Sequence, residues 1–359
     1  MITGTEQAAR PPRRAKVPAA LITLAALISG CAAPSGAAFR SLPATEGGAV
    51  VFRSAAAENQ DPFKAGRAAA AALKIEMGRT RLRAIIVYDC FEEEALKEKA
   101  LAGVASVFPG HILFGAATYG AFTQEGCLDL DSVALLGVGG AGIGVSAALE
   151  KNMGAADLSL EKDRAKLARA LGAAGQRLAR KLPRAADNRL LILLGDAHSP
   201  RNALLIDGVH KVLGKDFPIA GGSVNKDQGQ SFVYYRGRMY ADSAVGVMLS
   251  GDFKVSLAGR QAKSNEKVIS SARGAASEAM KNLKGVSLAV LAFNCAGRKG
   301  KLKRIEDELE AIQGITGRQV PLFGCYCAGE FGPADTADKT PGVLSSGCGR
   351  HVMFTFIGR

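Results

Sequence analysis

Tryptophan is absent from this chain of 359 residues, and aromatic side chains make up only 6% of it. The four histidines and the cysteines show no His-x-x-x-His pattern and no second cysteine pair with zinc-like spacing. The Gly-x-Ser-x-Gly motif of a nucleophile elbow is also missing. These absences argue against nucleic-acid binding, a zinc centre and an α/β-hydrolase site. We therefore expect no nucleic acid, metal or cofactor.

The first thirty residues have the order of an export signal. A basic stretch containing Arg13, Arg14 and Lys16 precedes an apolar run over 17–28, and Ser29-Gly30 stand directly before Cys31. The apolar run, about 12 residues, is too short for a hydrocarbon core that needs roughly 20. It predicts a cleaved signal peptide over 1–30. Because Ser29-Gly30-Cys31 matches a lipobox, we expect lipidation of Cys31.

The predicted anchor also predicts a location. Residues 31–48 are rich in Ala, Pro, Ser and Gly, which is typical of a tether. Ala32 after the lipidated cysteine favours the periplasmic face of the outer membrane if the source is Gram-negative. Arg13-Arg14 would also fit a twin-arginine signal, although the apolar residues of that motif are missing. We expect a lipoprotein of the cell envelope.

The chain is strongly basic, with a formal net charge of +13. The predicted signal peptide holds four basic residues and one acidic residue, so the mature chain keeps +10. Such a charge favours anionic surfaces. For an exported chain, anionic lipid or cell-envelope polymer is a better partner than nucleic acid. The apolar fraction of 48% is ample for a substantial core.

Six cysteines remain if Cys31 carries a lipid: Cys90, Cys127, Cys295, Cys325, Cys327 and Cys348. In an oxidising compartment an even number permits three disulfides, whose pairing the sequence leaves open. Buried thiols are the alternative.

One pattern occurs three times: an apolar strand, a helix, a second strand ending in Gly, and a later closing strand. The first strands cover 84–90, 190–194 and 288–293, and the glycines that end the second strands include Gly115, Gly221 and Gly324. Strands without apolar alternation are typically covered on both faces. The sequence predicts an α/β fold, with mixed sheets flanked by helices and built from three repeated strand-helix-strand-strand units. Two further helices are expected, near 160–182 and 265–283.

Three glycine-bearing loops follow these strands, where an open α/β sheet usually places its ligand. Their glycines let backbone N–H groups approach a small polar molecule, although tight turns alone would also need them. The candidate ligand-binding residues in these loops are Gly115, Thr118, Gly120, Gly221, Gly222, Asn225, Gly324, Cys325, Tyr326, Cys327, Gly329 and Glu330.

Some of these residues, and three positions outside the loops (Asp196, Cys295 and Arg298), carry reactive or charged side chains. Cys325 and Cys327 could bind a soft metal, exchange a disulfide with Cys295 or act as nucleophiles, or they could be structural. Asp196 lies in a polar loop and is a candidate to line a ligand crevice. Arg298 and Glu330 could bind the two ends of a zwitterion such as an amino acid, with Arg298 paired to its carboxylate.

From Val50 to Arg359 the chain resembles the FIST family of sensory domains. The amino-terminal part of the resemblance rests on Phe114 to Gly120, on Pro218 to Gly222 and on Phe232-Val233-Tyr234. The carboxy-terminal part rests on Asn294 to Arg298, Glu308-Leu309 and Pro321 to Pro333. The order and spacing of these fragments carry the match.

The resemblance implies ligand sensing rather than catalysis, with amino acids among the ligands proposed for the family. It implies a FIST N-like domain over 49–252 and a FIST C-like domain over 253–359. Carried over by position, it adds Cys295 and Arg298 to the candidates. The chain departs from the family pattern at Ser345 to Cys348, which puts its ligand specificity in doubt.

The leading hypothesis is a membrane-anchored sensory module that binds a small molecule and signals through a separate protein. That partner is expected because no kinase or cyclase segment follows the last strand. One alternative is a thiol-dependent enzyme, redox or metal protein using Cys325 and Cys327. Another is a structural envelope lipoprotein with a degenerate pocket.

Overall fold

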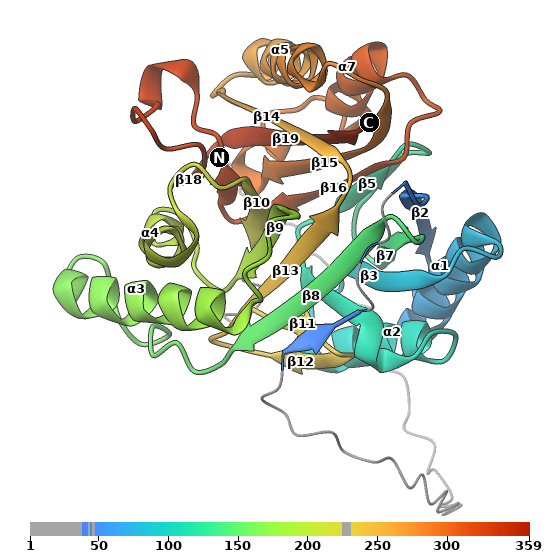
Figure 1. The fold of residues 1–359 in the computed structure, drawn as a ribbon, viewed down its shortest axis with the longest axis horizontal. Coiled ribbons are helices and arrows are strands. Elements are labelled where there is room, and N and C mark those ends of the chain that lie inside the picture. Colours follow the sequence, from blue (N-terminus) through green and yellow to red (C-terminus); the bar gives the residue numbers. More distant parts are fainter. Residues whose placement is uncertain (1–37, 42–43, 45–46, 225–230) are drawn as a thin grey trace, which may run out of the picture. The chain divides into compact units, whose positions relative to one another are not determined.

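The computed structural model describes residues 38–41, 44, 47–224 and 231–359, so the predicted signal peptide and lipidated Cys31 lie outside it. Residues Gly36–Arg359 form one compact unit. Three mixed sheets flanked by helices build this unit (Figure 1), which confirms the predicted fold class. None of the helices in the described part of the chain is long and apolar enough to cross a membrane.

Each sheet is built mainly by one stretch of chain with the order strand, helix, strand, helix, strand, closing strand. The first stretch comprises β2 (Val51–Glu58), α1 (Pro62–Met77), β3 (Leu82–Asp89), α2 (Glu94–Ala105), β4 (Leu113–Ala117) and β7 (Ser132–Gly139). The second comprises β8 (Ile143–Glu150), α3 (Arg164–Lys181), β9 (Asn188–Gly195), α4 (Asn202–Leu213), β10 (Ile219–Ser223) and β13 (Ala244–Gly251).

The third stretch comprises β14 (Lys254–Gln261), α5 (Asn265–Leu283), β15 (Ser287–Cys295), α6 (Ala296–Lys299), α7 (Glu306–Thr316), β16 (Leu322–Cys327) and β19 (His351–Gly358). Each unit therefore begins with a strand and a helix that the predicted repeat did not assign to it. The predicted helix over 265–283 coincides with α5. In each unit the second and third strands along the chain are parallel to each other: β3 with β4, β9 with β10, and β15 with β16. The other pairings within each unit are antiparallel.

Three short hairpins are exchanged between the sheets. They are β5 (Ala121–Thr123) with β6 (Cys127–Leu128), β11 (Val233–Tyr235) with β12 (Arg238–Tyr240), and β17 (Glu330–Gly332) with β18 (Ser346–Cys348). The hairpin after β4 pairs with β16, the hairpin after β10 with β4, and the hairpin after β16 with β10. Each hairpin covers an edge that would otherwise be open. The exchange ties together the parts of the chain before and after residue 252.

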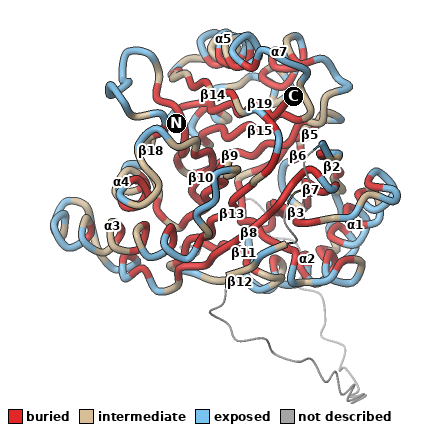
Figure 2. The backbone as a smooth tube through the Cα atoms, viewed as in Figure 1, coloured by how far each residue is buried: buried red, intermediate tan, exposed pale blue. Residues whose placement is uncertain are grey.

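One core lies between the inner faces of all three sheets, and three further cores lie under the helices. Tyr88, Ile192 and Phe293 represent the three sheets in the central core. On β9, Leu190, Ile192 and Leu194 face this core, whereas Leu191 and Leu193 face α3 and α4. Both faces are apolar because both are covered, as the runs without alternation predict. Figure 2 shows the buried strands inside the more exposed helices.

The amino-terminal strand β1 (Phe39–Arg40) adds to the free edge of β8. Two short 3-10 turns, η1 (Gly110–Ile112) and η2 (Thr336–Asp338), complete the elements. The sheet orders are β1-β8-β13-β9-β10-β17-β18, β12-β11-β4-β3-β7-β2 and β14-β19-β15-β16-β5-β6.

Candidate functional site

Two of the hairpin crossovers border a cavity of about 530 Å³ at the carboxyl ends of β15 and β16. Tyr119 comes from the crossover after β4 and Ala328 from the crossover after β16. The cavity is lined by Tyr119, Ser199, Gln261, Cys295, Ala296, Gly297, Cys327, Ala328, Gly349 and Arg350. Among these described lining residues, Arg350 alone carries a formal charge. The arrangement suits a small molecule with an anionic group.

Backbone hydrogen bonds fix the loops around this cavity. Tyr119 N–H donates to the Tyr326 carbonyl at 2.9 Å, and Ser199 N–H donates to the Ala328 carbonyl at 2.9 Å. Ser223 N–H donates to the Gly329 carbonyl at 2.7 Å. Loops of all three units are therefore held in one place by contacts that the exchange of hairpins creates.

Cys295 and Cys327 are directly paired across β15 and β16, and both border the cavity. Beneath them lies the completely buried carboxyl of Glu330. The Cys327 thiol lies 3.7 Å from Oε1 of Glu330, and Oε2 accepts the His351 N–H at 3.0 Å. Burial raises the pKa of Glu330 to about 8, because the charged form loses its hydration. This carboxyl is mostly protonated at neutral pH.

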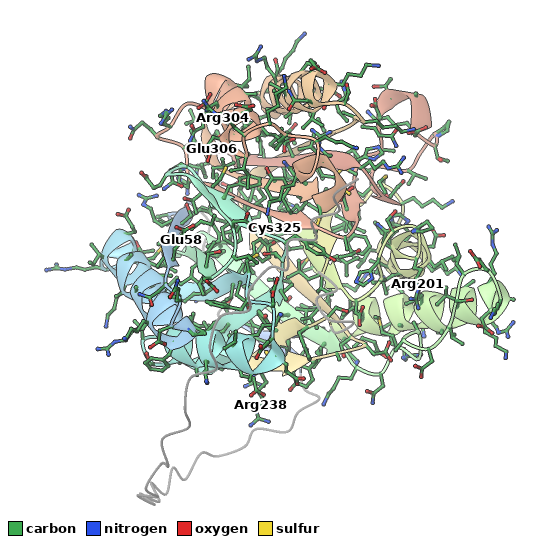
Figure 3. The ribbon with its side chains drawn as sticks, turned by 180° about the vertical axis from the view of Figure 1, so that it is seen from behind. Glu58, Arg201, Arg238, Arg304, Glu306 and Cys325 are labelled. Atoms are coloured by element: carbon green, nitrogen blue, oxygen red, sulfur yellow. The ribbon has the colours of Figure 1, made fainter. Side chains whose placement is uncertain are left out.

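The six cysteines in the described part of the chain are free thiols, so none of the permitted disulfides is present in the structure. Burial raises the pKa of Cys295 to about 11 and that of Cys348 to about 12, with the charge of Glu330 as a secondary cause. Burial likewise raises the pKa of Cys327 well above its ordinary value. Cys325 packs in the central core. In Figure 3 it lies in the interior, whereas Arg238 and Arg304 project at the periphery.

High thiol pKa values oppose nucleophilic and redox chemistry, since the thiolate is the reactive form. Among the residues that the structure describes, no group of three His, Cys, Asp or Glu side chains is arranged to hold a metal ion. Cys325 and Cys327 are both buried in the central core, and the raised pKa of Cys327 favours a structural role for that residue over a reactive one.

Arg298 does not reach the cavity. Its side chain is 0% exposed, and its Nη2 lies 2.6 Å from Oε1 of Glu308. The guanidinium also donates to the Ser271 hydroxyl at 3.1 Å and to the Val268 carbonyl at 3.0 Å. Tyr326 O–H donates to the other oxygen of Glu308 at 3.3 Å, and burial raises the pKa of Tyr326 well above its ordinary value. The expected zwitterion clamp between Arg298 and Glu330 is therefore closed to a ligand in this structure.

Most of the predicted glycines are required by close packing. A side chain on Gly115 or Gly221 would meet the backbone of the neighbouring strand, and one on Gly324 would meet the Phe122 ring. A Cβ on Gly222 would lie 2.7 Å from the Cys327 sulfur. Gly120 and Gly329 have φ of +127° and +145°, which other residues rarely adopt.

Two further predicted residues, Thr118 and Asp196, form hydrogen bonds that hold loops in place. Thr118 donates through its hydroxyl to the Asp89 carbonyl at 3.1 Å. Asp196 accepts from the Ser231 hydroxyl at 2.6 Å and from the Asp242 N–H at 3.1 Å. Asn225 lies outside the described residues.

Sequence reasoning missed Tyr119, Ser199, Gln261 and Arg350. The signal that could have found Arg350 is its position, directly after the Ser345 to Cys348 stretch that departs from the family pattern. Ser345 bonds Ile219, and Cys348 pairs with Glu330 through β18, which brings Gly349 and Arg350 to the cavity.

Two family profiles match the chain. The FIST N domain profile matches residues 84–275, more than half of the chain. The chain belongs to the FIST family. The FIST C domain profile matches residues 252–333. FIST domains are sensory domains that bind small ligands, so a sensory, ligand-binding role is supported.

Among solved structures, the FIST chain is similar to a cyanuric acid hydrolase from A. caulinodans. The identity is 10% and the TM-score 0.44, over 86% of this chain and 99% of that one. No curated protein sequence matches.

Proposed function

We propose that this FIST protein is an envelope lipoprotein that binds an amino-acid-like small molecule in the cavity beside Cys295 and Cys327, and that it signals through a separate protein. The observation that carries the proposal is the cavity, because its lining comes from loops of all three units and includes one cation, Arg350. A ligand carboxylate pairs with Arg350, while the neutral thiols and Tyr119 contact its body. The lipobox at Cys31 supports the anchor.

The ligand is tested by thermal unfolding in the presence of amino acids, small carboxylates and cell-wall fragments. A ligand at 100 times its dissociation constant should stabilise the protein by about 2.7 kcal/mol. Arg350→Gln should weaken binding by about tenfold to a hundredfold, because a charge-assisted hydrogen bond is lost. The matched control is Arg238→Gln. Arg238 is an exposed arginine on β12 that does not line the cavity, so this variant should keep the affinity.

Two outcomes would contradict this proposal. A well-folded protein with no thermal shift for any of these compounds would favour the structural-lipoprotein alternative. A ligand that binds Arg350→Gln as tightly as the parent would place the binding site elsewhere.

The anchor is tested separately by intact-mass spectrometry of the protein purified from its native membrane. A chain beginning at Cys31 and carrying acyl groups is expected. An unprocessed chain would refute the anchor without bearing on the cavity.

A further inference from the structure

Helix α3 has an unusual charge for a surface helix. Six of its 18 residues are basic and none is acidic; the basic residues are Arg164, Lys166, Arg169, Arg177, Arg180 and Lys181. All six are exposed. Helix α7 shows the opposite charge, with Glu306, Asp307, Glu308 and Glu310 and no basic residue in 11 positions. The two helices cover different sheets (Figure 1), so the charges of opposite sign are separated.

The charge of α3 is unfavourable for the helix itself. Arg164 and Lys166 lie in the first turn, where the positive end of the helix dipole disfavours cations. Lys166 and Arg169, three residues apart, repel each other on the helix surface. The first turn of α7, by contrast, carries three acids. The repulsion in α3 would be relieved by an anionic partner.

Most of these bases lack an acidic partner within the unit. Arg177 and Lys181 pair with Glu150 at 2.5 and 2.6 Å. Arg180 donates to the neutral amide of Gln176 at 3.3 Å. Among the ion pairs between described residues, none involves Arg164, Lys166, Arg169 or Arg180. Four exposed cations are therefore available to an external anion.

The chain enters the unit beside this helix. β1 runs antiparallel to β8, with Phe39 opposite Ala147 and Arg40 opposite Ser146. Its amino end therefore points along β8 toward Glu150, the residue to which α3 is paired. Phe39 follows Cys31 by eight positions, a reach of at most about 28 Å. This reach is comparable to the length of α3, about 27 Å for 18 residues.

We propose that the exposed face of α3 docks onto an anionic phospholipid bilayer next to the lipid anchor. The inference rests on the proposed anchoring at Cys31, because that anchor would hold the entry of the chain near the headgroups. The unpaired bases of α3 are attracted to anionic lipid. The acids of α7 are paired with Arg298 and Arg304, so that helix offers no such attraction. The docked protein therefore has one preferred orientation, and its cavity a fixed direction relative to the membrane.

The test uses the chain from Gly36, which lacks the signal peptide and the lipid. All four buried clusters lie between Val50 and Ile357 within one compact unit, so this chain folds without its first 35 residues. Co-sedimentation with phosphatidylglycerol–phosphatidylcholine vesicles should show binding that is lost in high salt. Vesicles of phosphatidylcholine alone should not bind.

Two variants with equal loss of charge locate the surface. The first removes the unpaired cations of α3 by Arg164→Gln, Lys166→Gln, Arg169→Gln and Arg180→Gln. The second removes four exposed cations from α1 and α5 by Arg67→Gln, Lys74→Gln, Lys267→Gln and Lys281→Gln. The α3 variant should lose at least about thirtyfold in partitioning, since each base at an anionic surface contributes about fivefold. The control should lose only about twofold.

Three results would overturn the inference: no vesicle binding at low salt, equal losses in both variants, or binding to a soluble polyanion such as polyphosphate without binding to vesicles. The ligand-induced thermal shift of the same chain serves as an independent readout. If the shift persists while vesicle binding fails, the docking inference fails and the proposed ligand site stands.

Discussion

Two buried acidic groups on neighbouring parts of the third unit have opposite surroundings. On the outer face of the sheet, Glu308 lies 2.6 Å from the Arg298 guanidinium and also accepts the Tyr326 hydroxyl. Beneath the cavity, Glu330 is equally buried, but its nearest partners are thiols and one backbone N–H. The first carboxylate has a counter-charge, whereas the second is kept neutral by its raised pKa.

This difference in surroundings distinguishes a carboxylate that stabilises the fold, Glu308, from a carboxyl that underlies the candidate site, Glu330. The buried Arg298–Glu308 ion pair joins α5, α6 and α7 above the sheet. Because its guanidinium already donates to Glu308, Ser271 and Val268, it does not serve a ligand. A protonated carboxyl under a cavity leaves the cavity floor uncharged. Arg298 and Glu330 were both expected to bind ligand, and the ion pair with Glu308 assigns Arg298 to the scaffold.

The largest effect is expected from breaking the buried ion pair. Arg298→Met leaves the Glu308 carboxylate buried without a counter-ion and should cost about 3–5 kcal/mol of unfolding free energy, measured by urea denaturation. The surface control is Arg304→Gln, whose 61% exposed side chain pairs with Glu310 at 2.9 Å. It should cost less than about 1 kcal/mol. Equal costs would show that burial does not set the strength of these pairs.

A second effect is expected from pH, acting through Glu330. Its pKa is about 8 in the folded chain against an ordinary value of 4.5. Between these values the folded state retains a proton that the unfolded chain has lost, so stability falls as pH rises. The slope contributed by this group is at most about 1.4 kcal/mol per pH unit.

Glu330→Gln replaces the titrating carboxyl by an amide that keeps no pH-dependent proton. It should therefore flatten the decline in unfolding free energy between about pH 4.5 and pH 8. Near pH 5 the variant should match the parent, and near pH 9 it should be the more stable protein. Urea denaturation across this pH range measures the effect. Parallel pH profiles for the two proteins would mean that Glu330 ionises normally in the folded state.

The smallest effect is expected where the backbone touches the thiols. Gly222→Ala would place a Cβ 2.7 Å from the Cys327 sulfur and should destabilise the fold by about 1–3 kcal/mol through overpacking. Gly274→Ala on α5, where a Cβ meets nothing within 4 Å, is the control and should be neutral or slightly stabilising. If Cys327→Ala does not rescue Gly222→Ala, the strain does not arise at the thiol.

Local patterns predicted much of the fold. The apolar runs at 84–90, 190–194 and 288–293 form strands β3, β9 and β15. The helix predicted near 160–182 from its leucine spacing is α3, and the one predicted over 265–283 is α5. The threefold repeat could be recognised in the sequence because each unit buries corresponding strands and helices, and burial requires apolar residues at corresponding positions. Close packing explains Gly115, Gly221 and Gly324, and glycine was the signal that made these positions conspicuous.

Local sequence patterns are enough to assign the repeated α/β units, the basic charge and the resemblance to the family. The exchange of hairpins between sheets, the Arg298–Glu308 pair and the place of Arg350 at the cavity are seen only in the folded chain. Strand and helix periodicity is a local property that a short window records. Pairing between β16 and β5, or between β10 and β17, joins residues separated by about a hundred positions or more, and the burial that shifts the pKa of Glu330 exists only once those pairs form.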